Sequence, residues 1–146
     1  MKVKDDKISR VVNAMFLLMN RMKAGMDECC LHNDNKLNEK EFFILTFIGS
    51  NKNAKMSEIS EALSTPLSTL TSIIDKLVNG KYLERYHSSE DRRVVLVTLA
   101  KNGKEIYQYT LEKKMDLGQR MLSEYSETEQ EELISYLENI PKSLDK

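Results

Sequence analysis

The sequence has no tryptophan, two prolines and two histidines among its 146 residues. With so few prolines and only five glycines, long disordered tracts are not expected. No apolar run is long enough to cross a bilayer, and the mixed-charge N-terminus does not lead into the apolar segment of a secretory signal. We therefore expect a cytoplasmic protein with no membrane partner.

The two cysteines, Cys29 and Cys30, are neighbours in the chain. Adjacent cysteines rarely pair with each other because the bridge would strain the peptide between them, and no CxxC spacing occurs. A disulfide framework is thus excluded, which fits a reducing compartment. The simplest interpretation is two inert thiols near a helix end, and the alternative is a redox switch at Cys29 or Cys30.

Motifs for catalysis are also missing. The chain contains no glycine-rich phosphate loop, no GxSxG and no HExxH. Glu28, Cys29, Cys30, His32 and Asp34 have side chains that can bind zinc, but so local a cluster does not specify a metal site or a nucleophile with its base. We predict that the protein is not an enzyme and holds no metal or cofactor.

Length and charge indicate a single soluble domain whose charge is unevenly spread. A chain of 146 residues with 40% hydrophobic content fits one domain with a modest core. The net charge is −1, but residues 75–104 carry seven basic and four acidic side chains. Residues 116–146 carry three basic and eight acidic side chains. This separation directs the middle segment, and not the C-terminus, toward phosphate.

The segment 65–80 predicts an amphipathic helix. Thr65 is expected to cap it, Pro66 to occupy its first position, and Gly80 to end it in the left-handed conformation. Apolar residues at helical spacing predict one buried face, made of Leu67, Leu70, Ile73, Ile74 and Leu77. Polar residues occupy the other face and its flanks: Ser68, Thr69, Thr71, Ser72, Asp75 and Lys76. This face either approaches base edges closely or simply meets water.

Two short strands with a charged tip follow this helix. Residues 82–86 and 94–99 are rich in β-formers, and residues 87–93 between them are polar and charged. An arginine at the tip of a hairpin can enter a minor groove, whose potential is negative. Taken alone, the tip is better interpreted as a solvated charged turn.

Arg92 and Arg93 are adjacent at the start of the second strand. Their side chains should therefore point to opposite sides. One arginine can then reach DNA while the other pairs with an acid such as Asp91 or Asp75. The residue pattern does not decide which arginine takes which role.

The segment before the amphipathic helix completes a helix-turn-helix pattern. Residues 56–63 predict a short helix, and Ser64 and Thr65 make a tight turn into the next one. Asn38 and Glu41 form a capping box for an earlier helix over 39–48, which Gly49 is expected to end. Residues 51–55 are predicted to be a turn.

The run DRRVVLVTL, preceded by STLTSIIDKLVNGKYLER, closely resembles the MarR family of bacterial transcriptional regulators. The specific part of the resemblance covers residues 37–103. In that family the segment before the wing is the recognition helix and a wing arginine contacts DNA. The resemblance slightly favours Arg93 for this contact, as part of a recurrent Asp-x-Arg unit. The resemblance implies a winged helix-turn-helix fold, mainly α with a small β-wing, that binds double-stranded DNA. The expected DNA-binding residues are Thr65, Ser68, Thr69, Thr71, Ser72, Lys76, Asp91, Arg92 and Arg93.

Long helices are predicted at both ends of the chain. Residues 8–26 carry an apolar stripe wider than one core needs, and 28–36 are polar and irregular. A second long helix covers 101–125, and Ser126 with Glu129 caps a last helix that ends just before Pro141. The resemblance implies that the terminal helices interlock in a homodimer. We expect one continuous domain with three regions: 1–36 and 101–146 for dimerisation, and 37–100 for DNA.

The combined prediction is a homodimeric repressor that binds a pseudo-palindromic operator and is released by a small apolar or aromatic effector or by an oxidant. Met15, Met19, Met22 and Met26 lie along one helix and either line an effector pocket or pack in the core and dimer interface. The rival function is a winged-helix protein-interaction module with little DNA affinity. Its support is the near-neutral charge and the single lysine of the amphipathic helix.

Overall fold

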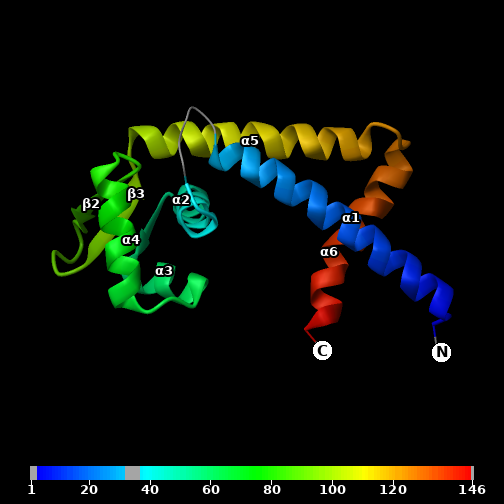
Figure 1. Cartoon of the computed structure of the whole chain (residues 1–146), viewed down its shortest axis with the longest axis horizontal. Coiled ribbons are helices and arrows are strands. Elements are labelled where there is room, and N and C mark those ends of the chain that lie inside the picture. Colours follow the sequence, from blue (N-terminus) through cyan, green and yellow to red (C-terminus); the bar gives the residue numbers. More distant parts are fainter. Residues whose placement is uncertain (1–2, 32–36, 146) are drawn as a thin grey trace. The chain divides into compact units, whose positions relative to one another are not determined.

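The computed structural model describes residues 3–31 and 37–145 (Figure 1). In chain order, these ranges form α1 (Asp5–Cys30), α2 (Glu39–Asn51), β1 (Asn53–Lys55), α3 (Met56–Leu63), α4 (Leu67–Asn79), β2 (Leu83–His87), β3 (Val95–Leu99), α5 (Lys101–Leu122) and α6 (Glu127–Leu144). Contacts divide the chain into two units, Met1–Thr110 and Leu111–Lys146, and α5 runs from the first into the second. Within the described ranges, no helix combines the length and the apolar character that a membrane span requires.

The first unit has its core among the end of α1, α2, α3, α4, the sheet and the start of α5, elements that Figure 1 labels. The largest fully buried side chains are Ile44, Leu45, Ile48, Ile59, Leu70, Ile74, Leu77, Leu83, Val97 and Ile106. They recur at helical spacing in α2 and α4, and β2 and β3 contribute Leu83 and Val97, so each of these elements buries one side against the others. The predicted fold class, mainly α with a small β-wing, is confirmed.

The sheet contains three antiparallel strands in the order β1-β3-β2. Leu83 lies opposite Leu99 in the β2–β3 hairpin, and Ala54 of β1 lies opposite Val97 on the other side of β3. The prediction that residues 51–55 form only a turn is therefore wrong for β1. A strand of three residues is too short to show alternation, and its partner lies more than 40 residues further along the chain.

The start of α2 is confirmed as a capping box. The Asn38 side chain accepts from the Glu41 N–H at 2.9 Å, and the Glu41 carboxylate accepts from the Asn38 N–H at 3.0 Å. The predicted end at Gly49 is wrong, because α2 continues to Asn51. A Cβ on Gly49 would lie 2.5 Å from the ring of Tyr107 in α5. The glycine therefore allows α5 to pack closely against α2.

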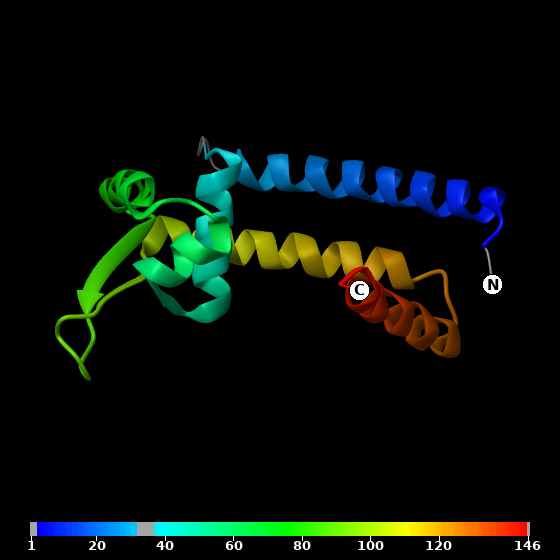
Figure 2. The ribbon, with the colours of Figure 1, turned by 90° about the horizontal axis from the view of Figure 1, so that it is seen from below.

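The first helix, α1, runs without interruption to Cys30 (Figure 2). The prediction of an irregular segment from residue 28 is wrong for Glu28, Cys29 and Cys30, since both cysteines are buried in the core of the first unit. His32 lies outside the described residues. Most apolar side chains of α1 remain exposed: Val3, Ile8, Val11, Val12, Met15, Phe16, Leu17, Met19 and Met22 precede or lie along this helix with at least 41% of their surface open.

The second unit contains the end of α5 and all of α6. The predicted pairing of Ser126 with Glu129 is confirmed: the N–H and hydroxyl of Ser126 donate to the Glu129 carboxylate at 2.9 and 2.7 Å. These hydrogen bonds lower the pKa of Glu129. The predicted helix end before Pro141 is wrong, because α6 continues to Leu144. Pro141 lies in the last turn, where its missing N–H removes only one hydrogen bond from the helix.

Candidate nucleic-acid interface

The turn between α3 and α4 is held by hydrogen bonds around Thr65. Ser64 adopts the left-handed conformation, with φ 48°, and the Ser60 hydroxyl donates to the Thr65 carbonyl at 2.6 Å. Thr65 donates its own hydroxyl to the Leu63 carbonyl at 3.2 Å and is only 4% exposed. Its predicted role as the cap of α4 is wrong: Pro66 occupies the N-cap position and the helix begins at Leu67. Because Thr65 is buried, we remove it from the proposed DNA surface.

The two faces of α4 agree with prediction except at its first residue. Leu70, Ile74 and Leu77 are buried, and the polar residues of the other face are exposed. Leu67, predicted to be inward, is 52% exposed because it lies at the end of the helix that projects past the core. The exposed polar set comprises Ser68, Thr69, Thr71 and Ser72. The Thr71 hydroxyl donates to the Leu67 carbonyl at 2.7 Å, which leaves its oxygen free to accept.

Both charged residues in the second half of α4 have partners within the protein. Asp75 pairs with Arg85 of β2 at 2.6 Å, which joins the helix to the base of the wing. Lys76 pairs with Glu41 of α2 at 2.5 Å, and the Glu41 side chain is only 3% exposed. The sequence predicts that Lys76 contacts DNA, but in the structure its ammonium group is already engaged by Glu41. The Glu41 cap was evident from sequence, but its ion pair was not.

The C-terminus of α4 is fixed by a Schellman motif. The Tyr82 N–H donates to the Leu77 carbonyl at 2.9 Å, and the Lys81 N–H donates to the Val78 carbonyl at 3.0 Å. The left-handed residue is Lys81, with φ 59°, and not Gly80 as predicted. A Cβ at position 80 would lie 2.7 Å from the Tyr82 ring, so any larger residue there would displace that ring.

The segment after α4 is also tied to the start of α5. The Asn102 amide donates to the Gly80 carbonyl at 2.9 Å, and the Asn102 N–H donates to the Lys81 carbonyl at 3.1 Å. The Ala100 N–H donates to the Tyr82 carbonyl at 2.9 Å. We call these three hydrogen bonds the α4–α5 junction. They place the base of the wing relative to the helix, and sequence periodicity gives no sign of them.

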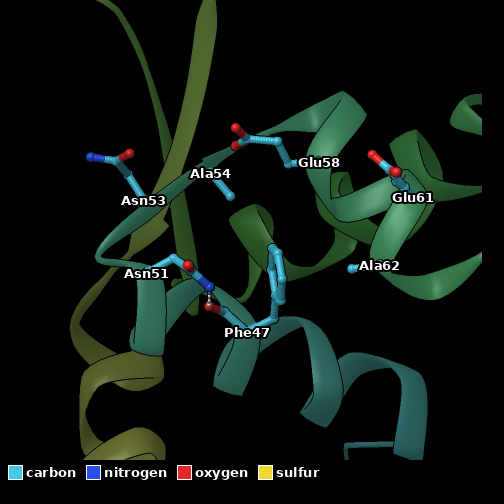
Figure 3. Close-up of a pocket in the computed structure, with 7 residues that line it drawn as sticks. All are labelled: Phe47, Asn51, Asn53, Ala54, Glu58, Glu61 and Ala62. Carbon is cyan, nitrogen blue, oxygen red and sulfur yellow. Dashed lines mark hydrogen bonds between the residues drawn. The ribbon is translucent and has the colours of Figure 1, made fainter. Parts of the chain in front are cut away.

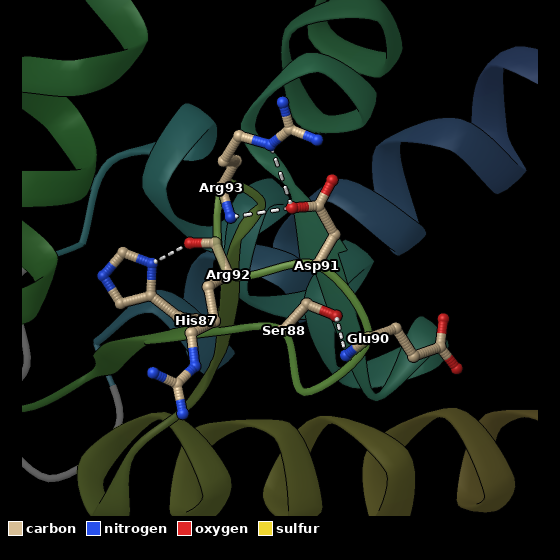
Figure 4. A network of polar contacts seen from close by, with 6 residues as sticks. All are labelled: His87, Ser88, Glu90, Asp91, Arg92 and Arg93. Atoms are coloured by element: carbon tan, nitrogen blue, oxygen red, sulfur yellow. Dashed lines mark hydrogen bonds and ion pairs between the residues drawn. The ribbon is translucent and has the colours of Figure 1, made fainter.

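The wing tip between β2 and β3 is an ordered turn, shown in Figure 4. The Asp91 carboxylate accepts from the N–H of Arg93 at 3.0 Å and from its Nε at 3.3 Å. Nδ1 of His87 is 2.8 Å from the Arg92 carbonyl oxygen, and the Ser88 hydroxyl oxygen accepts from the Glu90 N–H at 3.2 Å. These contacts shape the tip from inside, so its guanidinium groups can project outward.

The two wing arginines differ in their partners. Their guanidinium groups point to opposite sides of the tip, as predicted (Figure 4). Arg93 pairs with Asp91, whereas the acid Asp75 is taken by Arg85. For Arg92, the described part of the chain supplies no ion pair to its guanidinium. Arg92 is therefore the arginine whose charge is available to a phosphate or a groove.

The cysteines do not have the surroundings of reactive thiols. Neither Cys29 nor Cys30 forms a disulfide, and they are 3% and 5% exposed. Burial, followed by the nearby negative groups, raises the pKa of Cys30 to about 11. Among the described residues, no group of three His, Cys, Asp or Glu side chains could hold a metal. Two members of the zinc-capable cluster considered above, His32 and Asp34, lie outside the described residues.

A surface hollow lies beside the helix-turn-helix, between the end of α2, β1 and α3 (Figure 3). Phe47, Ala54 and Ala62 give it an apolar part, and Glu58 and Glu61 bring negative charge to it. Part of the polar lining is already engaged: the Glu58 carboxylate accepts from the Lys55 N–H at 2.7 Å, and the Asn51 amide donates to the Phe47 carbonyl at 2.8 Å. Its negative charge makes this hollow unsuited to phosphate.

The succession of α3, a tight turn, an outward-facing α4 and a β2–β3 wing defines a winged helix-turn-helix protein. Comparison with known proteins places it more narrowly. The sequence model of the MarR family matches residues 37–95. The HTH-type transcriptional regulator PecS of Dickeya dadantii (strain 3937) is 32% identical over 112 residues, which are 75% of this chain and 68% of PecS. The chain belongs to the MarR family, and it is a transcriptional regulator, not an enzyme.

Further comparisons agree with this assignment. The transcriptional repressor MprA of Escherichia coli (strain K12) is 28% identical over 137 residues, covering 88% of this chain and 78% of MprA. The crystal structure of Streptococcus pneumoniae FabT in complex with DNA matches with a TM-score of 0.80 at 23% identity, over 94% of this chain and 97% of FabT. At that identity the structural likeness establishes the shared fold.

Proposed function

We propose that this protein is a homodimeric repressor that binds a pseudo-palindromic DNA operator and is released by a small apolar or aromatic effector. The observation that carries the proposal is the outward face of α4. Its short side chains are exposed along one side of the helix, beside a wing whose tip presents Arg92. Such a face lets a helix backbone approach base edges in the major groove. We further propose that the protein acts in the bacterial cytoplasm, where its operator lies.

The proposed DNA surface consists of α4 and the wing tip. Its residues are Ser68, Thr69, Thr71, Ser72, Asp91, Arg92 and Arg93. The helix would supply contacts to base edges, and the wing would follow the flanking minor groove, where an arginine meets negative potential. Asp91 serves here by holding Arg93 in place rather than by touching DNA, since a carboxylate facing phosphate would be repelled.

Dimerisation is proposed from the exposed apolar surface of α1. Phe16 and Leu17 are 62% and 68% exposed, and they have apolar neighbours along the whole helix. A patch of this extent needs cover from another protein surface. On α6, Tyr136 and Leu144 are also exposed, by 66% and 75%. We assign residues 1–36 and 101–146 to dimerisation and residues 37–100 to DNA, with half-sites about one helical turn, roughly 34 Å, apart.

Repression and effector release are the finer parts of the proposal. The relatives MprA and MdtR are named repressors, and Met15, Met19 and Met22 offer an adaptable apolar surface on α1. A small apolar or aromatic effector suits such a surface. An oxidant signal through Cys29 or Cys30 has less support, because burial and a raised pKa keep the Cys30 thiol protonated.

One observation favours a different function, a protein-interaction module without DNA affinity. The only basic residue on α4 is Lys76, and its ammonium is paired with Glu41. The net charge of −1 gives no general attraction to DNA. The two functions predict opposite results in a DNA-binding experiment.

The test is recovery of genomic DNA fragments by the full-length protein, followed by measurement of affinity against salt. A repressor should enrich fragments that share a pseudo-palindrome, and log K should fall with log [salt] by about 0.9 for each phosphate contact. The variant Ser72→Glu should abolish enrichment by repelling phosphate. Ser50→Glu is the control, because it adds the same charge at an exposed position of α2, outside the proposed DNA surface and the segments assigned to dimerisation. Absence of enrichment by the parent protein, or unchanged binding by Ser72→Glu, would contradict the proposal.

A further inference from the structure

Glu41 is the only charged residue that the fold buries within the described ranges, with 2% of its surface exposed. A buried carboxylate is costly unless hydrogen bonds and an opposite charge compensate it. Both oxygens of Glu41 are compensated. Oε2 accepts from the Asn38 N–H at 3.0 Å, and Oε1 accepts from Lys76 Nζ at 2.5 Å. One carboxylate therefore joins the first turn of α2 to the third turn of α4.

Two other sets of polar contacts hold α4, but the half-exposed Asp75 carboxylate ties it to the wing through Arg85 and the α4–α5 junction ties it to α5. Its packing against the core is different in kind. Leu70, Ile74 and Leu77 bury apolar surface, and apolar attraction has no preferred direction. Small rotations or shifts of α4 along its axis would keep most of that burial. An ion pair with defined geometry does not tolerate such shifts, because moving Lys76 away leaves a charge buried without its partner.

We infer that Lys76 is a positioning residue, which sets the placement of the reading face of α4 through Glu41, and that it is not a phosphate contact. The inference rests on the proposed DNA-binding function of α4. Lys76 is 67% exposed, so its stem reaches the surface, but the partner that holds its ammonium is the buried carboxylate. Losing this link should disturb specific recognition more than general attraction to DNA.

The test is a double-mutant cycle in the full-length protein with Lys76→Met, Glu41→Gln and the two combined. Methionine keeps the length of the lysine stem, and glutamine keeps an oxygen for the Asn38 N–H. Two 30-base-pair duplexes serve as probes: one selected by the wild-type protein from a random library, and a scrambled duplex of equal composition. Lys40→Met is the matched control, since Lys40 is exposed on α2 and lies outside both the proposed DNA surface and the segments assigned to dimerisation. Thermal unfolding of each variant ensures that binding is measured on folded protein.

Lys76→Met should weaken binding to the selected duplex about tenfold, and it should change binding to the scrambled duplex by less than about twofold, because phosphate attraction is independent of sequence. The salt slope should stay at the wild-type value. Adding Glu41→Gln to Lys76→Met should cause no further loss, because the link between the two side chains is already absent, so the losses of the two single variants should not add. Lys40→Met should leave the preference for the selected duplex unchanged.

Three results would overturn the inference. A salt slope lowered by about one unit, with equal losses on both duplexes, would make Lys76 a phosphate contact. Losses of Lys76→Met and Glu41→Gln that add in the double variant would remove the role of Glu41. A lower melting temperature with unchanged preference for the selected duplex would make the link structural only. Failure of the proposed function is distinguishable, since the wild-type protein would then select no duplex at all, and the inference would fall with it.

Discussion

Replacing Gly103 with alanine should strongly destabilise the α4–α5 junction. Gly103 lies buried in the first turn of α5, and a Cβ there would be 2.1 Å from the Tyr82 carbonyl oxygen and 3.1 Å from its carbon. Both partners in this clash are backbone, so no side-chain rotation relieves it. The same carbonyl accepts from the Ala100 N–H at 2.9 Å, which means that any retreat of Tyr82 stretches a junction hydrogen bond.

The size of the effect follows from these contacts. Overpacking a close-packed site costs about 1–3 kcal/mol. The three junction hydrogen bonds contribute about 1 kcal/mol each, and a shift of Tyr82 weakens some of them. Alanine returns about 0.5–1 kcal/mol through its better helix propensity. We expect a net loss of about 3 kcal/mol in the free energy of unfolding, which lowers the melting temperature by about 6–12 °C in a chain of this size.

The assay is thermal unfolding followed by circular dichroism, at one protomer concentration because a dimer's stability depends on it. Gly118→Ala is the matched control in the same helix, since a Cβ at Gly118 meets nothing within 4 Å. Because alanine has a higher helix propensity than glycine, the free energy of unfolding of this control should rise by about 0.5–1 kcal/mol. If Gly103→Ala unfolds within about 0.5 kcal/mol of the parent protein, the packing argument is refuted.

Three further predictions concern the wing, the reading helix and the thiols. Arg92→Ala should weaken operator binding by about 1–3 kcal/mol and lower the salt slope by about one unit, measured by fluorescence anisotropy. Arg93→Ala should cost less because Asp91 already holds its guanidinium, and equal losses would contradict this difference. Exposed Leu67 should contact the methyl group of a thymine in the operator. Replacing that thymine with deoxyuridine should weaken operator binding by the parent protein but not by Leu67→Ala. An equal loss of affinity in both proteins would exclude the contact. The pKa of Cys30 is raised to about 11, so iodoacetamide should alkylate it far more slowly at pH 8 in the folded protein than in urea. The alkylation rate should rise as the pH approaches 11. Rapid alkylation of the folded protein at pH 8 would contradict this prediction.

Local patterns in the sequence were sufficient for the elements that carry the site. The bounds of α3, the capping box of Asn38 with Glu41, and the buried residues Leu70, Ile74 and Leu77 were predictable. Each depends on residues within one or two turns of one another, where helical spacing and capping chemistry act directly. The two strands of the wing were predictable for the same reason, since their β-formers flank a polar tip.

Contacts between distant parts of the chain decided the rest. The sequence predicts that Lys76 contacts DNA, because no acidic residue three or four positions from it in the chain indicates an ion pair. Its partner is Glu41, which lies 35 residues earlier. The sequence predicts a helix end at Gly49, but the structure gives this glycine a different role, because a Cβ there would clash with the Tyr107 ring of α5. Leu67 follows the apolar spacing but lies beyond the edge of the core, so it is exposed. Spacing along a chain determines which residues share a face, but what that face meets is determined only when the elements pack together.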